Sequence, residues 1–137
     1  REALILASII EKETAKPSER RTIAAVYSNR LREGMKLQAD PTVIYPITKG
    51  KPLGRRILRS ELEAQNGYNT YAMTGLPIGP ICNPGRASID AALHPGDSDA
   101  LYFVADGTGG HIFAKTLAEH QENVRKWYAI RRQRGEM

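Results

Sequence analysis

The chain has 137 residues, of which 41% are hydrophobic and 26% are charged, and its formal net charge is +5. This length and balance predict a single globular domain over residues 1–137 and exclude a disordered chain. No apolar run approaches the roughly 20 residues of a membrane-spanning helix, and the single cysteine, Cys82, excludes an internal disulfide. Because the chain begins at Arg1 and enters an apolar segment at once, we expect it to be a piece of a longer protein.

The excess of positive charge is spread along the chain, with local clusters at residues 55–56 and 131–134. A basic balance is compatible with a polyanionic partner. Since no nucleic-acid recognition motif accompanies the clusters, we predict a solvated basic surface and no nucleic-acid partner.

The first predicted helix runs from about Ala3 to Ala15, because the residue before Pro17 is pushed out of the helical region. From Ala3 to Ile10 the only polar side chain is Ser8. A helix that is apolar on every face is expected to be buried in the core.

A second helix is predicted around an apolar stripe, with arginines on its solvent side. The stripe is Ile23, Val26, Tyr27 and Leu31, and the arginines are Arg20, Arg21, Arg30 and Arg32. Gly34 is placed to end this helix as a left-handed cap. Beyond it we expect a turn, a short helix with Asp40 as N-cap and Pro41 in its first position, and a surface loop over residues 49–54.

Further along, Ser60 and Glu63 form a capping-box pattern that predicts another short helix. Residues 66–86 are too rich in glycine and proline for regular structure, yet they hold aromatic and apolar residues, which favours a binding loop over a linker. The dipeptide at residues 83–84 is then expected to cap a helix that Pro95 closes.

The C-terminal part predicts a β-hairpin followed by a long helix. Residues 101–105 and 111–114 flank a glycine-rich turn, and Thr116 with Glu119 forms a second capping box. The predicted fold class is therefore α+β, mainly helical, with a small hairpin near the C-terminus.

Carboxylates close the apolar first helix, and they are the leading candidates for chemistry. Loss of solvent raises the pKa of a carboxyl group, which a general acid working near neutral pH requires. Apolar residues precede both Glu11 and Glu13 at spacings of three and four. Helical periodicity therefore does not indicate which of the two glutamates lies on the buried face. The competing interpretation leaves both exposed at the helix end, with Lys12 and Lys16 as partners.

Two further groups of polar residues suit a carbohydrate. Gln38 and Asp40 can orient a sugar hydroxyl or acetamido group, and Asp40 can instead serve as a second carboxylate or as the N-cap. The segment Tyr68, Asn69, Thr70 and Tyr71 combines aromatic rings with amide and hydroxyl groups, as carbohydrate clefts do. A tyrosine core contact with Asn69 in a turn is the competing interpretation of that segment.

The three histidines, His94, His111 and His120, follow no familiar ligand spacing, so we expect neither a metal site nor a cofactor. His111 follows two glycines and is the best placed of the three to line a cleft. The glycine-rich segment before it lacks the lysine of a phosphate-binding loop and is interpreted as a turn.

Several short segments, taken in order, carry a resemblance to a known family. They are residues 7–13 (ASIIEKE), 29–31 (NRL), 34–42 (GMKLQADPT), 68–71 (YNTY), 75–77 (GLP), 83–85 (NPG), 102–104 (YFV) and 110–111 (GH). In these segments the chain resembles the endolytic murein transglycosylases of the YceG-like family. It departs from the family pattern at Ile78, where a second proline is common, and at Cys82.

The resemblance implies a lysozyme-like catalytic domain of a bacterial enzyme that is held in the inner membrane by a segment outside this chain and faces the periplasm or cell wall. Such an enzyme cuts the bond between N-acetylmuramic acid and N-acetylglucosamine within nascent peptidoglycan strands and leaves 1,6-anhydro ends. The implied partners are peptidoglycan glycan strands and peptidoglycan synthases. Two rival functions are a hydrolytic muramidase, with Asp40 holding a water, and a non-catalytic glycan-binding module.

The resemblance also assigns site residues. It places the catalytic acid on the first carboxylate of the Glu-Lys-Glu motif, Glu11, and the substrate-binding residues on Gln38, Asp40, Tyr68, Asn69, Thr70 and Tyr71. In the resulting hypothesis Glu11, protonated in an apolar pocket, donates to the glycosidic oxygen and then takes the proton from the C6 hydroxyl that attacks from within the sugar.

Overall fold

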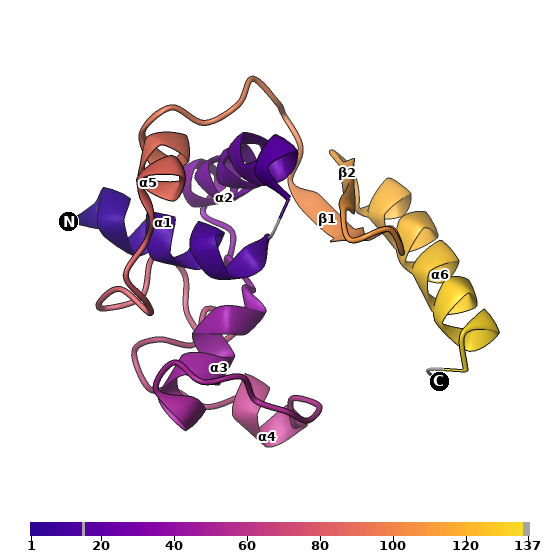
Figure 1. Ribbon diagram of the computed structural model, residues 1–137, viewed down its shortest axis with the longest axis horizontal. Helices are drawn as coiled ribbons and strands as arrows, with labels where there is room; N and C mark the ends of the chain where they lie inside the picture. The colour runs from indigo at the N-terminus through magenta and orange to yellow at the C-terminus, as the bar shows by residue number, and fades with distance from the viewer. Residues whose placement is uncertain (15, 136–137) are drawn as a thin grey trace.

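The computed structural model describes residues 1–14 and 16–135. Its elements in chain order are α1 (Glu2–Glu13), the 3-10 helix η1 (Pro17–Glu19), α2 (Arg20–Glu33), α3 (Asp40–Thr48), α4 (Arg59–Leu62), α5 (Arg86–Leu93), β1 (Tyr102–Ala105), β2 (His111–Ala114) and α6 (Leu117–Gln133). Figure 1 shows α1, α2 and α5 gathered above α3 and α4, with the hairpin and α6 standing to one side. We call these two parts the helical body (α1–α5) and the C-terminal arm (β1, β2 and α6). The predicted α+β class with a hairpin near the C-terminus is confirmed.

Helix α1 is the central element of the body and packs against α2, α3 and α5. Every residue from Ile5 to Ile10 is buried, as its apolar sequence predicts. The hydroxyl of Ser8, the polar member of this run, donates to the Ile5 carbonyl at 2.7 Å and accepts the Ile81 N–H at 3.0 Å, so it is satisfied within the core. The helix ends at Glu13, and the predicted end at Ala15 lies outside the described residues.

Helix α2 ends at Gly34, whose φ of 72° gives the predicted left-handed cap. The prediction that Arg30 lies on the solvent side was wrong. Arg30 is only 8% exposed, and its guanidinium donates to the Leu101 carbonyl at 2.6 Å and to the Lys36 carbonyl at 2.8 Å. These bonds tie α2 to the segment that enters the C-terminal arm.

Helix α3 begins at Asp40, one residue earlier than predicted. Ala39 is the N-cap, Asp40 is already helical, and Pro41 follows it. The predicted capping role of Asp40 was therefore wrong, and the Asp40 side chain is available to other groups.

Helix α4 also starts differently from the prediction. Its N-cap is Leu58, whose N–H donates to the Glu61 carboxylate at 2.8 Å, so the predicted pair of Ser60 and Glu63 does not form the cap. Helix α5 begins after Gly85 and not after residues 83–84. The side chain that satisfies its first turn comes from elsewhere in the chain, as described below.

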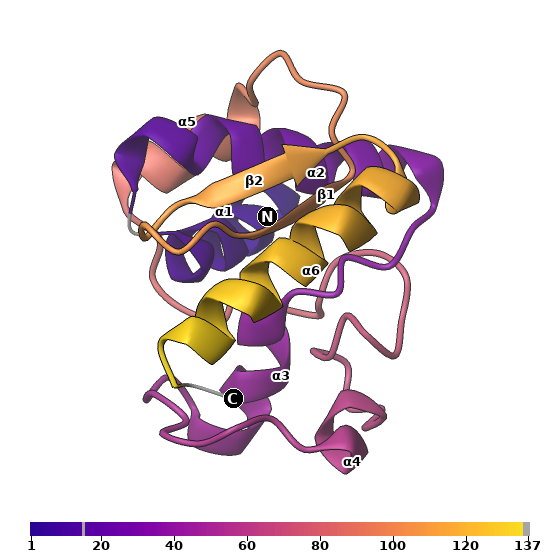
Figure 2. The same ribbon diagram turned by 90° about the vertical axis from the view of Figure 1, so that its right-hand side faces the viewer.

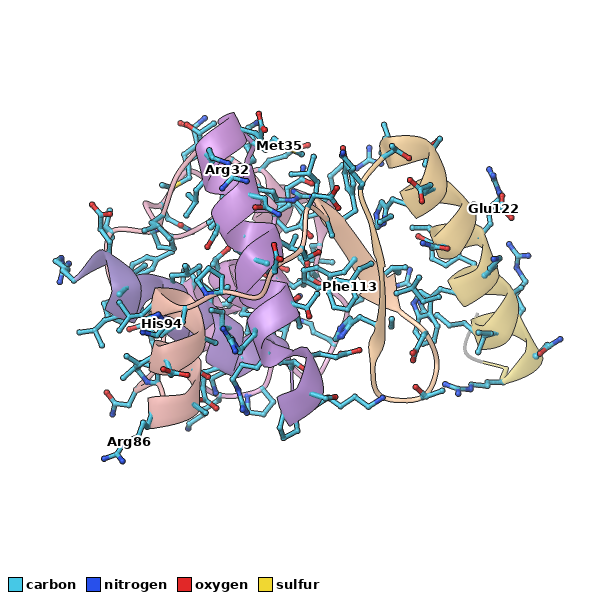
Figure 3. The ribbon with its side chains drawn as sticks, turned by 90° about the horizontal axis from the view of Figure 1, so that it is seen from above. Arg32, Met35, Arg86, His94, Phe113 and Glu122 are labelled. Carbon is cyan, nitrogen blue, oxygen red and sulfur yellow. The ribbon has the colours of Figure 1, made fainter. Side chains whose placement is uncertain are left out.

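The hairpin pairs β1 and β2 in antiparallel register, with Phe103 opposite Phe113. Both phenylalanines pack against the core of the helical body, and the ring of Tyr27 meets Phe103 edge-on at 5.8 Å. Figure 2 shows α6 lying across the hairpin, and Figure 3 shows the hairpin between the body and α6, with Phe113 on the side facing α2. Thr116 caps α6 as predicted, accepting the Glu119 N–H at 3.2 Å.

Within the part of the chain that the structure describes, none of the helices combines the length and the apolarity needed to traverse a bilayer.

Candidate active site

The last turn of α1 presents its two glutamates to opposite sides. Successive residues of an α-helix are turned by about 100°, so residues two apart point about 200° apart. Glu11 faces α5, and Glu13 faces the space between the helical body and the C-terminal arm. The structure therefore distinguishes Glu11 from Glu13, which the spacing of apolar residues in the sequence did not.

Glu11 is bound at the N-terminus of α5. Its Oε1 accepts the Gly85 N–H at 2.7 Å and the Ser88 hydroxyl at 3.0 Å. The bond from Gly85 lowers the pKa of Glu11, and Ser88 and the nearby positive charges of Arg20 and Lys12 lower it further. The expectation of a raised pKa at Glu11 was wrong, because the Gly85 N–H, the Ser88 hydroxyl and two nearby cations face this carboxylate where apolar packing was expected.

Glu13 has the properties that were expected of Glu11. Burial raises the pKa of Glu13 to about 8, and the negative charge of Asp40 contributes in the same direction, while a hydrogen bond from the Tyr27 hydroxyl opposes them. A carboxyl group with this pKa is mostly protonated at neutral pH. It can therefore donate a proton, as a general acid must.

Glu13 lies in a cleft with a cavity of about 290 Å³ between the helical body and the C-terminal arm. Both parts of the molecule and the connecting loops contribute residues to its lining. The lining residues are Glu13, Tyr27, Arg30, Leu37, Gln38, Asp40, Tyr71, Phe103, Val104, Ala105, His111 and His120. The polar groups in this list can contact the hydroxyl and amide groups of a sugar, and the aromatic rings can contact its apolar faces.

Three of the predicted substrate-binding residues meet at this cleft: Gln38, Asp40 and Tyr71. The Tyr71 hydroxyl donates to Asp40 Oδ1 at 2.5 Å, and burial together with this bond raises the pKa of Tyr71. Gln38 has a left-handed φ of 51°, and its N–H donates to the Thr70 carbonyl at 3.2 Å. Such a conformation is sparsely populated outside glycine and recurs at functional sites.

Asn69 and Thr70 do not line the cleft, because they are 1% and 0% exposed. The amide of Asn69 donates to three carbonyls within residues 61–64. The hydroxyl of Thr70 accepts the Ala39 N–H at 2.9 Å and lies 2.8 Å from that of Thr42. Asn69 holds the Tyr71 loop against the end of α4, and Thr70 holds it against the start of α3. The expectation that these two side chains contact substrate is therefore corrected to a structural role.

Tyr68 is also outside the residues that line the cleft. Its ring packs on Tyr45 with centroids 5.0 Å apart, which matches the competing interpretation of a tyrosine core contact.

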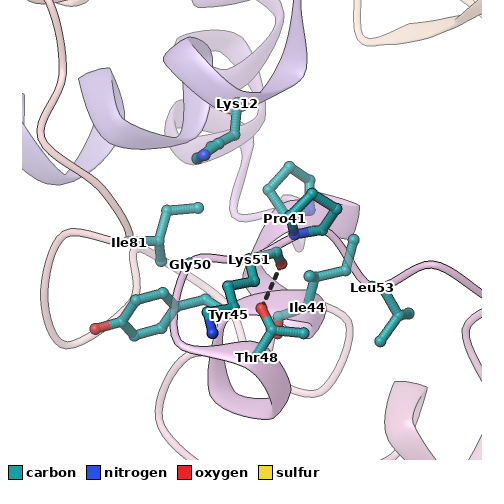
Figure 4. Close-up of a pocket in the computed structure, with 10 residues that line it drawn as sticks. Lys12, Pro41, Ile44, Tyr45, Thr48, Gly50, Lys51, Leu53 and Ile81 are labelled. Carbon is teal, nitrogen blue, oxygen red and sulfur yellow. Dashed lines mark hydrogen bonds between the residues drawn. The ribbon is translucent and has the colours of Figure 1, made fainter.

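A second pocket lies beside the cleft, between the end of α1, helix α3 and the loop that follows it (Figure 4). Asp40 lines the cleft, whereas the next residue, Pro41, lines this pocket of about 240 Å³. Its charged lining residues are Lys12 and Lys51, and the Thr48 hydroxyl donates to the Lys51 carbonyl at 2.6 Å. Among the described residues that line this pocket none is acidic, whereas Glu13 and Asp40 line the cleft.

Sequence reasoning missed Tyr27, Arg30 and His120 as cleft residues. Tyr27 and Arg30 are three apart on α2, and that spacing was available as a signal once a cleft at this helix was suspected. His120 packs on the Tyr102 ring at 5.0 Å, and burial lowers its pKa. His111 lines the cleft as expected.

A protonated carboxyl group in an open, polar cleft is the arrangement of a general-acid enzyme. Residues 1–126 match the YceG-like family, and the chain belongs to that family.

Similar proteins agree with this assignment. The chain is 44% identical over 131 residues to an endolytic murein transglycosylase of Bacillus subtilis, covering 96% of this chain and 36% of the relative. It is 39% identical over 129 residues to an endolytic murein transglycosylase of Streptococcus pneumoniae, covering 90% of this chain and 23% of the relative. The crystal structure of a YceG-like protein from Listeria monocytogenes superposes with a TM-score of 0.80 at 45% identity, over 88% of this chain and 38% of that one. The chain thus spans about a third or less of the curated relatives it matches.

Proposed function

We propose that this domain is an endolytic peptidoglycan lytic transglycosylase, a lyase that cleaves between N-acetylmuramic acid and N-acetylglucosamine and leaves 1,6-anhydro ends. The observation that carries the proposal is the pKa of Glu13, raised to about 8 in a cleft that both parts of the molecule line. The names of the curated relatives supply the substrate class.

In the proposed reaction Glu13, and not Glu11, is the catalytic residue. The protonated carboxyl group of Glu13 donates its proton to the glycosidic oxygen as the bond to the anomeric carbon breaks. The resulting carboxylate accepts the proton of the C6 hydroxyl group, whose oxygen bonds to the anomeric carbon of the same sugar. Because the nucleophile belongs to the substrate, one carboxyl group serves both steps and no activated water is required.

Asp40 and Tyr71 have a supporting role in this proposal. The negative charge of Asp40 keeps the proton on Glu13, which is one of the causes of the raised pKa. The same charge stabilises the positive charge that develops at the sugar in the transition state. The Tyr71 hydroxyl holds the Asp40 carboxylate in place through its 2.5 Å hydrogen bond.

The products of peptidoglycan digestion test the reaction. Purified domain is incubated with uncrosslinked glycan strands, and the new ends are identified by mass spectrometry. We expect 1,6-anhydro-muramic ends with no incorporation of ¹⁸O from labelled water. Products that are one water heavier would make the domain a hydrolytic muramidase. Strands that are retained by the domain at full length would make it a glycan-binding module.

We further propose that the complete protein is anchored in the inner membrane by a segment outside this chain, faces the periplasm or cell wall, and works beside peptidoglycan synthases. The proposal follows from the substrate, which lies outside that membrane. Fractionation and protease accessibility of the full-length protein in spheroplasts test the location, and crosslinking in growing cells tests the synthases. Recovery of the full-length protein in the soluble cytosol would contradict this arrangement.

A further inference from the structure

A second carboxylate, Glu19, reaches the cleft indirectly by binding His111. Glu19 belongs to η1, and His111 opens β2, 92 residues later in the chain. One carboxylate oxygen of Glu19 lies 2.8 Å from His111 Nδ1, and the other accepts the His111 backbone N–H at 2.8 Å. The side chains are 15% and 14% exposed, so this two-point contact is largely shielded from water.

Glu19 approaches the chain closely at the glycine before His111. A Cβ atom at Gly110 would lie 2.8 Å from the second carboxylate oxygen and 2.7 Å from Lys16 Nζ. Both distances are shorter than real contacts of a Cβ atom, so a side chain here would require the ends of Glu19 and Lys16 to shift. Glycine at residue 110 leaves room for the contact without such a shift.

The contact fixes which ring nitrogen of His111 carries the proton. A neutral imidazole has one N–H donor and one acceptor nitrogen, and an ionised carboxylate only accepts. The proton of the neutral ring therefore lies on Nδ1, toward Glu19, and Nε2 is left as an acceptor. Among the described residues Nε2 has no hydrogen-bond partner, and it is not one of the enclosed polar atoms, so it is open to a ligand.

The remaining surroundings of the ring hold it at the cleft wall. Phe103 meets the ring edge-on with centroids 5.1 Å apart, and Phe113 lies on another side at 6.4 Å. His111 lines the same cavity as Glu13. The ring thus has a defined orientation and tautomer at the site where the proposed chemistry takes place.

We propose that His111 is a substrate-binding residue of the cleft, whose Nε2 accepts a hydrogen bond from a hydroxyl group of the glycan strand, and that Glu19 is the positioning residue that sets its tautomer. The proposal rests on the proposed function of the cleft and deepens it. It assigns a specific acceptor for the sugar to the C-terminal arm, opposite the acid of the helical body.

Replacing His111 by asparagine or glutamine separates this role from a purely structural one. The amide nitrogen of asparagine falls near Nδ1, so H111N keeps a donor toward Glu19 and loses the acceptor in the cleft. The amide of glutamine reaches the place of Nε2, so H111Q keeps a polar group there. We expect kcat/KM on glycan strands to fall about tenfold in H111N, as loss of one hydrogen bond allows, and to be partly restored in H111Q. H94N, at the exposed end of α5, is the matched control.

E19Q tests the positioning role. Its amide oxygen can still accept the backbone N–H of His111, but its NH₂ group then faces Nδ1 and favours the tautomer with the proton on Nε2. We expect the ¹⁵N and ¹H correlations of the ring to report this change, with kcat/KM falling as in H111N and the melting temperature nearly unchanged.

The outcomes distinguish this inference from the proposed function. Wild-type activity in folded H111N or E19Q would overturn the inference and leave Glu13 as the acid. An unchanged His111 tautomer in E19Q would overturn the positioning role. A wild-type domain that produces no anhydro ends would instead overturn the proposed function, whatever the two variants do.

Discussion

The two sides of the last turn of α1 give the same kind of side chain opposite properties. On the side of α5, Glu11 accepts the Gly85 N–H and the Ser88 hydroxyl near two cations, and its pKa falls. On the side of the cleft, Glu13 is half-buried beside the negative charge of Asp40, and loss of solvent together with this charge raises its pKa to about 8. The comparison shows that burial alone does not make an acid, since the donors and charges that accompany burial decide the direction of the shift.

The largest expected effect comes from E13Q. Removing the proton donor should lower kcat on glycan strands by a factor of about 10² to 10⁴, the usual contribution of general acid catalysis. The fold should be retained, because a neutral amide resembles the protonated carboxyl group in size. Single-turnover assays measure the rate of cleavage, and circular dichroism of the same sample measures whether the fold is retained. E11Q is the matched control, and an E13Q protein that cleaves as fast as E11Q would remove Glu13 from the mechanism.

The pH dependence should follow the same group. Above the pKa of Glu13, about 8, the acid form disappears and kcat/KM should fall about tenfold per pH unit. A carboxyl group whose pKa is raised from 4.5 on folding binds more protons in the native state, so its contribution to stability decreases as pH rises from about 4.5 to 8. E13Q should therefore gain stability over wild type across this interval, on the order of 4 kcal/mol by pH 8, because one pKa unit corresponds to about 1.4 kcal/mol. Denaturant unfolding at pH 5 and pH 8 would contradict this if the difference between the two proteins stayed constant.

E11A should affect stability and leave the chemistry in place. Loss of the acceptor for Gly85 and Ser88 leaves the first turn of α5 uncapped, at a cost of about 1 to 2 kcal/mol. In wild type the lowered pKa means that this contribution is present above pH 4.5 and is lost as pH falls through the folded pKa. Thermal unfolding together with kcat per folded molecule checks the prediction. A folded E11A protein without activity would restore Glu11 as the candidate acid.

The smallest expected effect is that of D40N on the pKa of Glu13. Without the negative charge of Asp40 the pKa of Glu13 should fall, so the alkaline limb of the kcat/KM profile should move to lower pH. Y71F is the companion variant, because it keeps the charge of Asp40 and removes its 2.5 Å hydrogen bond. An alkaline limb at the same pH in D40N and wild type would show that burial alone sets the pKa of Glu13.

Much of the fold was predictable from local sequence. The uniformly apolar α1, the Gly34 cap of α2, the hairpin and the Thr116 cap of α6 each follow from residues close together in the chain. The starts of α4 and α5 were predicted wrongly, because Glu61 and the distant Glu11 supply their acceptors. Glu61 belongs to α4 itself, whereas the acceptor of α5 comes from another helix and leaves no local pattern in the sequence of α5.

The sequence by itself determined that this domain is α+β and that carboxylates follow a buried helix, because these features depend on periodicity and turn chemistry within a few residues. Tyr71 was placed near a cleft by the resemblance to the family and not by its local pattern. Only the tertiary structure decided between Glu11 and Glu13. The pKa of each depends on groups that are distant in the chain: the N-terminus of α5 for one, and Asp40 with the walls of the cleft for the other.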